Sequence, residues 1–267
     1  SEVEQVGHPS EVRHPLLREA LLVTGVEKQV EISAMADIPA GTGLGSSGTF
    51  TVGLLRALHA HRHDAISPAA LAELACHVEI DRLHEPIGKQ DQYIAAIGGV
   101  TAFEFCPDGQ VNVSPVRLGG GARSQLEENL LLFYTGVKRS ASDVLAIEQR
   151  PGADLDDNLD AVRTSGRQSY EALEAGDLDK FGALLTEQWE LKLQRSPSEV
   201  HSQVDGWIRD GIRAGAAGGK LVGAGGGGFL LFYAENKADL RAVMATHGLD
   251  EVRFRMDYEG STTIVAQ

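Results

Sequence analysis

The spacing of apolar residues predicts a chain in which helices and strands alternate. Apolar and polar positions alternate over 30–37, which predicts a strand, and apolar residues three or four apart after Ser47 predict a helix to about His63. A helical turn after residue 89 should end at Gly98-Gly99. Because strands and helices follow one another, we expect the α/β class. Further helices are predicted over 14–24, 67–83, 154–175, 177–193, 197–216 and 238–247, and strands over 100–105, 111–116, 130–134, 229–233, 252–258 and 262–266.

Glycines are concentrated between the predicted strand and the helix that follows it. Gly41, Gly43 and Gly45 lie within five residues, and the hydroxyls of Ser46 and Ser47 come next. Glycines let backbone N–H groups turn toward a ligand, and a helix start adds free donors and the positive end of its dipole. A tight turn capped by serine is the plainer interpretation, but this density of glycine favours a phosphate site. The loop lacks the GK[ST] ending of a Walker A motif and the acidic partner of a dinucleotide fingerprint.

A second cluster of glycines lies near the C-terminus, where five of the six residues in 223–228 are glycine. A plain turn needs two or three, so we expect this backbone to pack closely against a ligand or against the first glycine loop. The glycine-rich stretch 119–122 is a candidate domain boundary. It divides the chain into 1–122 and 123–267.

Charge and composition narrow the classes of partner. The 267 residues carry a formal net charge of −14 and include only two cysteines, Cys76 and Cys106. The acidic balance argues against nucleic acid or an anionic membrane as partner, while a small anionic ligand stays compatible. Two cysteines are too few for a disulfide framework, and we expect Cys76 to be a buried thiol. With no signal peptide or long apolar run evident, we expect a cytoplasmic protein; a homodimer stays open.

Three motifs, in order, resemble a known family. PAGTGLGSS, IGKQDQ and KLVGAGGGGFLLF are similar to the second motif, the catalytic segment and the third motif of the GHMP kinases. The runs IGKQDQYIAAIGG, LLFYTGVKRSASDVL and EQWELK are most similar to the sugar-kinase group that includes heptose 7-phosphate kinases and fucokinase-like enzymes. The resemblance begins at about His14. The family's first motif, a strand with a glycine-rich stretch, has no counterpart here, and we expect it to lie outside this sequence.

The resemblance implies a fold and an activity. The fold is an N-terminal phosphate-binding domain and a C-terminal ferredoxin-like domain, with the active site between them. The activity is an ATP-dependent, magnesium-requiring sugar kinase, acting on the anomeric O1 of a heptose 7-phosphate. An octose 8-phosphate or L-fucose stays open as substrate, and so does a non-catalytic protein that only binds a ligand. A small alcohol such as mevalonate or homoserine is disfavoured by the QDQ segment.

The resemblance also assigns roles to single residues. Ser47 and Glu79 would bind magnesium, with Asp81 as the rival of Glu79. Asp91 would accept the proton of the attacking hydroxyl or orient that hydroxyl. Lys89 would bind the substrate's phosphate or offset charge during transfer; the alternative is a salt bridge to Asp91. The nucleotide would be held by Pro39, Gly41, Gly43, Leu44, Gly45, Ser46, Ser47, Gly225 and Gly226, and the substrate by Gln90, Lys138, Arg139 and Lys192. Trp189 is either a substrate-side or a core residue.

Overall fold

The computed structural model describes residues 3–39, 41–137, 155–195 and 199–264. The chain forms two compact units, and each is discontinuous in sequence. The first unit comprises residues 1–40, 45–101 and 257–267, and the second comprises 41–44 and 102–256. The domain boundary expected after residue 122 therefore falls inside the second unit, which already begins at Ala102.

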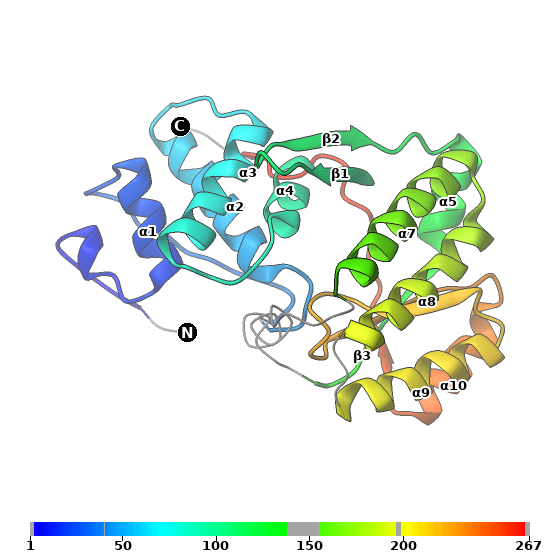
Figure 1. Ribbon diagram of the computed structural model, residues 1–267. Coiled ribbons are helices and arrows are strands. Elements are labelled where there is room, and N and C mark those ends of the chain that lie inside the picture. Colours follow the sequence, from blue (N-terminus) through cyan, green and yellow to red (C-terminus); the bar gives the residue numbers. More distant parts are fainter. Residues whose placement is uncertain (1–2, 40, 138–154, 196–198, 265–267) are drawn as a thin grey trace. The chain divides into compact units, whose positions relative to one another are not determined.

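The first unit is helical. A short 3-10 turn, η1 (Pro9–Glu11), precedes α1 (Pro15–Thr24), α2 (Ser46–His61), α3 (Pro68–Cys76), the π-helical turn η2 (His77–Arg82) and α4 (Gln90–Ile97). Helix α2 packs against α1, α3 and α4 (Figure 1). Leu55, Leu58 and Leu71 are almost fully buried among these helices, and the thiol of Cys76 is buried as expected. The helices predicted for this part of the chain are confirmed.

Local capping explains why these helices begin and end where they do. The His14 side chain accepts a hydrogen bond from the backbone N–H of Leu17, and Pro15 fills the first helical position of α1. The helix stops at Gly25, whose left-handed φ of 66° suits a glycine cap. Ser67 caps α3 in the same way as His14 caps α1.

The predicted strand over 30–37 is wrong, because residues 30–36 have no regular secondary structure. A strand needs a neighbour with which to form hydrogen bonds. Among the described residues the only sheets are a hairpin and a four-stranded sheet, and neither includes this segment.

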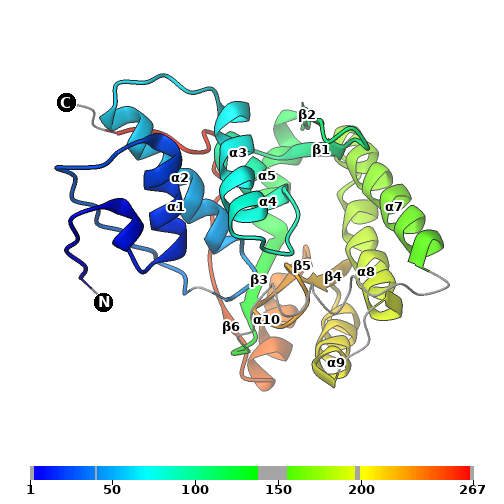
Figure 2. The same cartoon turned by 60° about the vertical axis from the view of Figure 1, so that its left-hand side comes forward.

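The second unit contains both sheets. The hairpin of β1 (Thr101–Phe105) and β2 (Val111–Pro115) confirms the predicted pair of strands. Antiparallel pairing gives the larger sheet the order β4-β5-β3-β6. With α9 before β4 and α10 before β6, this is the βαββαβ order of a ferredoxin-like fold (Figure 2). Its elements are α5 (Gly120–Asn129), β3 (Leu130–Tyr134), α7 (Leu155–Ala175), α8 (Leu178–Arg195), α9 (Glu199–Arg213), β4 (Gly218–Leu221), β5 (Phe229–Tyr233), α10 (Lys237–Thr246) and β6 (Asp250–Glu251).

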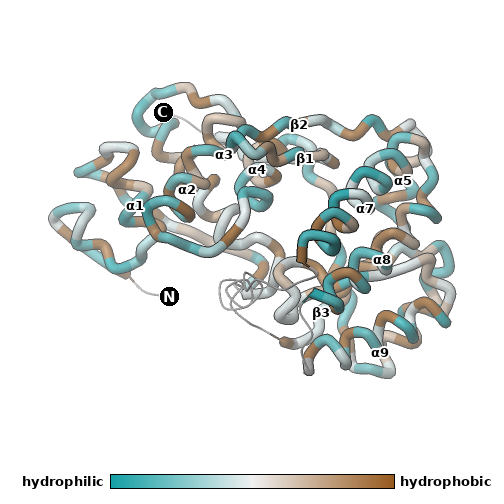
Figure 3. Tube along the Cα trace, in the orientation of Figure 1, coloured by the Kyte–Doolittle hydropathy of each residue, from teal (hydrophilic) through white to brown (hydrophobic). Residues whose placement is uncertain are grey.

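Helices cover both faces of this sheet. Gly211 of α9 and Leu240 of α10 lie against Phe232 on one face, whereas Gly182 of α8 lies against Tyr233 on the other. Helix α7 packs on α8, and Figure 3 shows hydrophilic and hydrophobic residues alternating along both helices. The apolar core includes Trp189, which is 2% exposed and is therefore a core residue.

Three segments of the second unit differ from the sequence prediction. The stretch 119–122 is not an open break, because α5 begins at Gly120. Strand β4 was not predicted, because its two glycines lack the apolar side chains that mark a strand. The predicted strands over 252–258 and 262–266 are not formed by the described residues: β6 ends at Glu251, and from Asp257 the chain belongs to the first unit. No helix in the described ranges is long and apolar enough to cross a membrane.

Candidate active site

The first glycine loop has the backbone geometry that its sequence predicted. Gly41, Gly43 and Gly45 have φ values of 77°, 78° and 66°, in the left-handed region that glycine adopts without strain. Helix α2 begins directly after Gly45, which as N-cap residue offers no side-chain hydrogen bond to the helix. The first-turn N–H groups of α2 thus receive no side-chain cap from this position, as an anion-binding helix start requires.

A buried carboxylate lies beside this helix start. The Ser47 hydroxyl donates a hydrogen bond to Oε1 of Glu79, and the Gln92 amide donates one to Oε2 at 2.6 Å. Glu79 and Gln92 are both fully buried. Burial raises the pKa of Glu79, the two hydrogen bonds lower it, and the nearby charge of Asp91 raises it further, with a net upward shift. The structure therefore brings Ser47 and Glu79 together as the proposed metal assignment requires.

The rival assignment, Asp81, is not part of this cluster. Its carboxylate contacts Nδ1 of His77 at 2.8 Å on the surface, where 64% of the side chain is exposed. Both acids lie on η2 but two residues apart, so they do not share a face: Glu79 is buried and Asp81 is exposed. Sequence periodicity alone left the two acids open.

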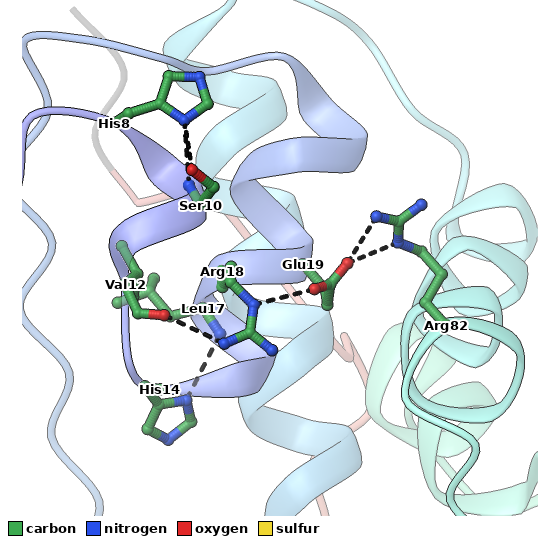
Figure 4. Close-up of polar contacts among 8 residues, drawn as sticks. All are labelled: His8, Ser10, Val12, His14, Leu17, Arg18, Glu19 and Arg82. Atoms are coloured by element: carbon green, nitrogen blue, oxygen red, sulfur yellow. Dashed lines mark hydrogen bonds and ion pairs between the residues drawn. The ribbon is translucent and has the colours of Figure 1, made fainter.

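An ion-pair network fixes the end of this turn to α1. Glu19 is 9% exposed and accepts hydrogen bonds from Arg18 at 3.1 Å and from Arg82 at 2.8 Å (Figure 4). Burial alone would raise the pKa of Glu19, but the hydrogen bonds from Arg82 and Arg18 outweigh it, and the pKa is lowered. Since Arg82 follows Glu79 by three residues, the network holds the segment that presents the buried carboxylate.

Asp91, at the start of α4, lies against the start of α2. A Cβ atom placed on Gly45 would come within 2.9 Å of the Asp91 carboxyl carbon, and one on Gly48 within 3.0 Å of the Asp91 Cβ. Only glycine at these two positions leaves room for the aspartate. The Asp91 residue is exposed overall, but the protein atoms around it partly desolvate its carboxylate, and this raises its pKa.

Lys89 is paired with a carboxylate other than Asp91. Its ammonium group contacts both carboxylate oxygens of Glu73 on α3 at 3.1 Å, and the Tyr93 hydroxyl also donates to Glu73. The alternative in which Lys89 forms its salt bridge with Asp91 is therefore replaced by a bridge to Glu73. Gln90 begins α4 and is exposed.

In the second unit, the two glycine-rich segments pack backbone to backbone. A Cβ atom on Gly43 would come within 2.9 Å of the Val222 carbonyl, Gly223 contacts the backbone of Gly43, and Gly228 contacts that of Thr42. This confirms that the second cluster packs against the first glycine loop. The Thr135 N–H donates to the Gly228 carbonyl at 2.8 Å, which ties the cluster to the end of β3.

Of the remaining predicted residues, the structure describes Lys192 and Pro39 but not Lys138 or Arg139. Lys192, on α8, lies against Gly225, whose carbonyl contacts the ring of the buried His201 at 2.8 Å. Pro39 is exposed. Lys138 and Arg139 lie outside the described residues.

Three residues of interest were not singled out from the sequence: Gln92, Glu73 and Lys220. Gln92 adjoins Asp91, and Lys220 is a lone charge in an apolar segment.

Comparison with known proteins agrees with the folds of the two units. The family model described as GHMP kinases N terminal domain matches residues 12–99, and the one described as GHMP kinases C terminal matches residues 169–247. Together they match more than half of the chain. The chain belongs to the GHMP kinase family.

Two of the relatives are described as sugar kinases. The chain is 31% identical over 205 residues to a D-glycero-alpha-D-manno-heptose 7-phosphate kinase of Campylobacter jejuni, covering 75% of this chain and 60% of the relative. It is 30% identical over 265 residues to a bifunctional fucokinase/GDP-fucose pyrophosphorylase of Arabidopsis thaliana, covering 92% of this chain and 25% of the relative. The chain thus spans less than two thirds of either protein.

A solved structure shares the fold. The crystal structure of a D-glycero-D-manno-heptose 1-phosphate kinase from Bacteroides thetaiotaomicron matches with a TM-score of 0.72 and 26% identity, covering 92% of this chain and 71% of that one.

Proposed function

We propose that this chain acts in an ATP-dependent sugar kinase, which transfers the γ-phosphoryl group of ATP to the anomeric hydroxyl, O1, of a heptose 7-phosphate. The observation that carries the proposal is the cluster at the start of α2, where Ser47 and Gln92 hold the buried Glu79 and where Asp91 lies against Gly45. The similarity to the heptose 7-phosphate kinase of Campylobacter jejuni supports the choice of substrate.

The donor set at Glu79 fits magnesium. Mg²⁺ prefers oxygen ligands and is usually bound by one or two carboxylates together with substrate phosphates. Ser47 and Glu79 supply a hydroxyl and a carboxylate, and Oε1 of the buried Gln92 has no hydrogen-bond partner among the described residues. The described residues contain no group of three or more His, Cys, Asp or Glu side chains that could hold a metal ion. When bound, magnesium would neutralise charge on the transferring phosphoryl group.

The protein groups would hold the nucleotide and orient the acceptor. Backbone N–H groups of residues 43–47 would donate to the phosphates, and Gly225 and Gly226 are further candidates for contacts with the nucleotide. Asp91 would accept the proton of the O1 hydroxyl as that oxygen attacks, or orient it for attack. Lys89, anchored by Glu73, would place a positive charge beside the acceptor. We propose the cytoplasm as its location, because ATP and sugar phosphates are found there.

A substrate comparison with the full-length natural protein tests this function. We expect kcat/KM for a heptose 7-phosphate to exceed that for the unphosphorylated heptose by about 10–100-fold, because a charge-assisted contact is lost. In the product, ³¹P coupling to the anomeric proton should identify O1 as the site of transfer. Faster turnover of an octose 8-phosphate or of L-fucose would reassign the substrate. Absence of turnover with all four sugars would favour the non-catalytic alternative.

A further inference from the structure

Lys220 carries a partly buried positive charge. It lies on β4, and its Nζ donates to the Gln188 side-chain oxygen on α8 at 2.8 Å. Strand alternation places Lys220 on the same sheet face as Gly218, which packs directly on Gly182 of α8. The neutral Gln188 amide does not balance the charge, and Lys220 forms no ion pair with any residue that the structure describes.

A second ammonium group lies close by. Lys192 follows Gln188 by one turn of α8, so both side chains are on the same helix face. The Lys192 side chain occupies the space beside Gly225: a Cβ atom there would be 2.7 Å from Cε and 3.4 Å from Nζ of Lys192. Burial and the charge of Lys192 lower the pKa of Lys220 to about 8, so the two ammonium groups repel each other.

The loop beside these lysines is held in place. Gly225 has a left-handed φ of 96°, and its carbonyl is fixed by the His201 ring. The ring of Trp189 packs edge-on against His201 with centroids 5.2 Å apart. Neither contact depends on a ligand, so Lys192 lies beside a glycine backbone that is already held in place.

Two neighbouring lysines, one of them partly buried without a counter-charge among the described residues, reduce the stability of the fold. Buried charges are normally paired, and an unpaired one persists where a ligand completes it. A phosphate dianion would offset the charge of Lys220 beside the ammonium group of Lys192, and phosphate accepts hydrogen bonds from ammonium groups readily.

We propose that Lys192 and Lys220, beside Gly225, form a binding site for a phosphoryl group on the second unit. The proposal rests on the proposed function only for the source of that group. The group belongs either to the sugar-phosphate acceptor or to the end of the nucleotide's phosphate chain.

Inorganic phosphate, used as the probe, tests the site without turnover. In the full chain, Lys220→Met keeps the length of the side chain and removes its charge, and Lys192→Met does the same at its neighbour. Lys180→Met, at an exposed lysine on α8, is the matched control. We expect phosphate to raise the Tm of the wild type and of Lys180→Met, and to raise it much less in the other two variants.

Stability without phosphate separates a binding role from a structural one. If the charge of Lys220 is balanced only by a bound anion, Lys220→Met should have a Tm equal to or above that of the wild type in phosphate-free buffer. A lower Tm, together with an unchanged response to phosphate in Lys192→Met, would overturn the proposal. A phosphate response that is the same in all four proteins would overturn it as well.

Kinetics then identify the source of the phosphoryl group. We expect Lys220→Met to raise KM by about 10–100-fold for one substrate and to leave the other unchanged, since one charge-assisted contact is lost. A rise for the sugar phosphate assigns the site to the acceptor, and a rise for ATP assigns it to the nucleotide. Unchanged KM values for both would overturn the proposal. If the wild type turned over no sugar at all, the phosphate response would still decide it.

Discussion

Glu79 is fully buried, and both of its carboxylate oxygens accept hydrogen bonds from neutral side chains. Because the pKa of Glu79 is raised in the folded protein, its contribution to stability is fully present below its unfolded pKa of about 4.3 and is lost as the pH rises through the folded value. Above its folded pKa, the ionised group therefore reduces stability. A buried carboxylate that reduces the stability of the fold is typical of a functional site.

We predict that Glu79→Gln raises the free energy of unfolding at pH 7 relative to the wild type, and that the difference shrinks toward pH 4. A rotation of the Gln92 amide lets its unpartnered oxygen accept from the new amide. Urea unfolding at several pH values measures this effect. The magnesium concentration for half-maximal rate should rise at least about tenfold, since even ligand-supporting residues contribute that much.

Asp81→Asn is the matched control for Glu79→Gln, because Asp81 lies on the same turn and points to the surface. Asp81→Asn should have the same free energy of unfolding and the same magnesium dependence as the wild type. Loss of stability in Glu79→Gln at all pH values, with magnesium dependence intact, would make Glu79 a structural residue.

Asp91→Asn tests the proposed base. The substitution keeps size and removes the charge that accepts a proton, so kcat should fall by about 10²–10⁴-fold. Because Asp91 is exposed, the Tm should change little. The kcat of this variant and of Asp81→Asn, measured under saturating substrates, gives the comparison. A variant that keeps most of its kcat would contradict the role of Asp91.

At the scale of elements, the contact between the starts of α2 and α4 depends on one helical glycine. A Cβ atom on Gly48 would lie 3.0 Å from the Asp91 Cβ and 3.1 Å from the Gln92 backbone nitrogen. We predict that Gly48→Ala destabilises the protein by about 1–3 kcal/mol, as overpacking does, and lowers kcat by displacing Asp91.

Gly53, on the same helix, is the control for Gly48. It is exposed, and nothing lies within 4 Å of its added Cβ atom. Gly53→Ala should therefore stabilise the protein by about 0.5–1 kcal/mol through helix propensity alone, with kcat unchanged. If the two alanine variants behaved alike in thermal melts, the α2–α4 contact would not be tight.

The network between α1 and η2 predicts sensitivity to acid. Since the pKa of Glu19 is lowered, the stability that it contributes is present above its unfolded pKa and is lost as the pH falls through the folded value. Glu19→Gln should cost roughly 1.5–3 kcal/mol at pH 7, the usual worth of a hydrogen bond to a charged group. The variant should lose less stability than the wild type between pH 5 and about pH 3.

Unfolding of Glu19→Gln across this pH range should be compared with that of Glu27→Gln, since Glu27 is exposed in the same unit. Parallel stability curves for the wild type and Glu19→Gln would contradict the prediction.

Local signals account for what the sequence predicted well. The helix start at Pro15 and its end at Gly25 depend on neighbouring residues only, and so does the glycine loop before Ser47. The strand over 30–37 could not be judged in this way, because a strand depends on a partner elsewhere in the chain. For the same reason, Glu73 could not be foreseen as the partner of Lys89. The choice between Glu79 and Asp81 depended on contacts with Ser47 and Gln92, which are distant in the sequence.

At the scale of the whole molecule, the C-terminal segment completes the first unit. The Gly99 N–H donates to the Asp257 carbonyl at 2.6 Å, and Gly260, with a φ of 64°, packs against the backbone of Ala96 and Ile97. We predict that truncation before Asp257 lowers amide-exchange protection of α2 and α4 by at least about tenfold, because about 1.4 kcal/mol of lost packing suffices. The amides of β3 and β5 serve as the internal control, and equal losses in both units would contradict the prediction.

Because the chain returns to its first unit after the second, the second unit can finish folding before the first during synthesis on the ribosome. The second unit, apart from four residues, is one continuous stretch that can fold as soon as it has left the exit tunnel. The end of α4 must wait for Gly260, which follows the whole of the second unit in the sequence. Contacts of such long sequence separation form slowly, and the unfinished surface stays open to chaperones and proteases until they do. A pause in translation between the second unit and Gly260 would thus expose the helices of the first unit rather than the sheet of the second.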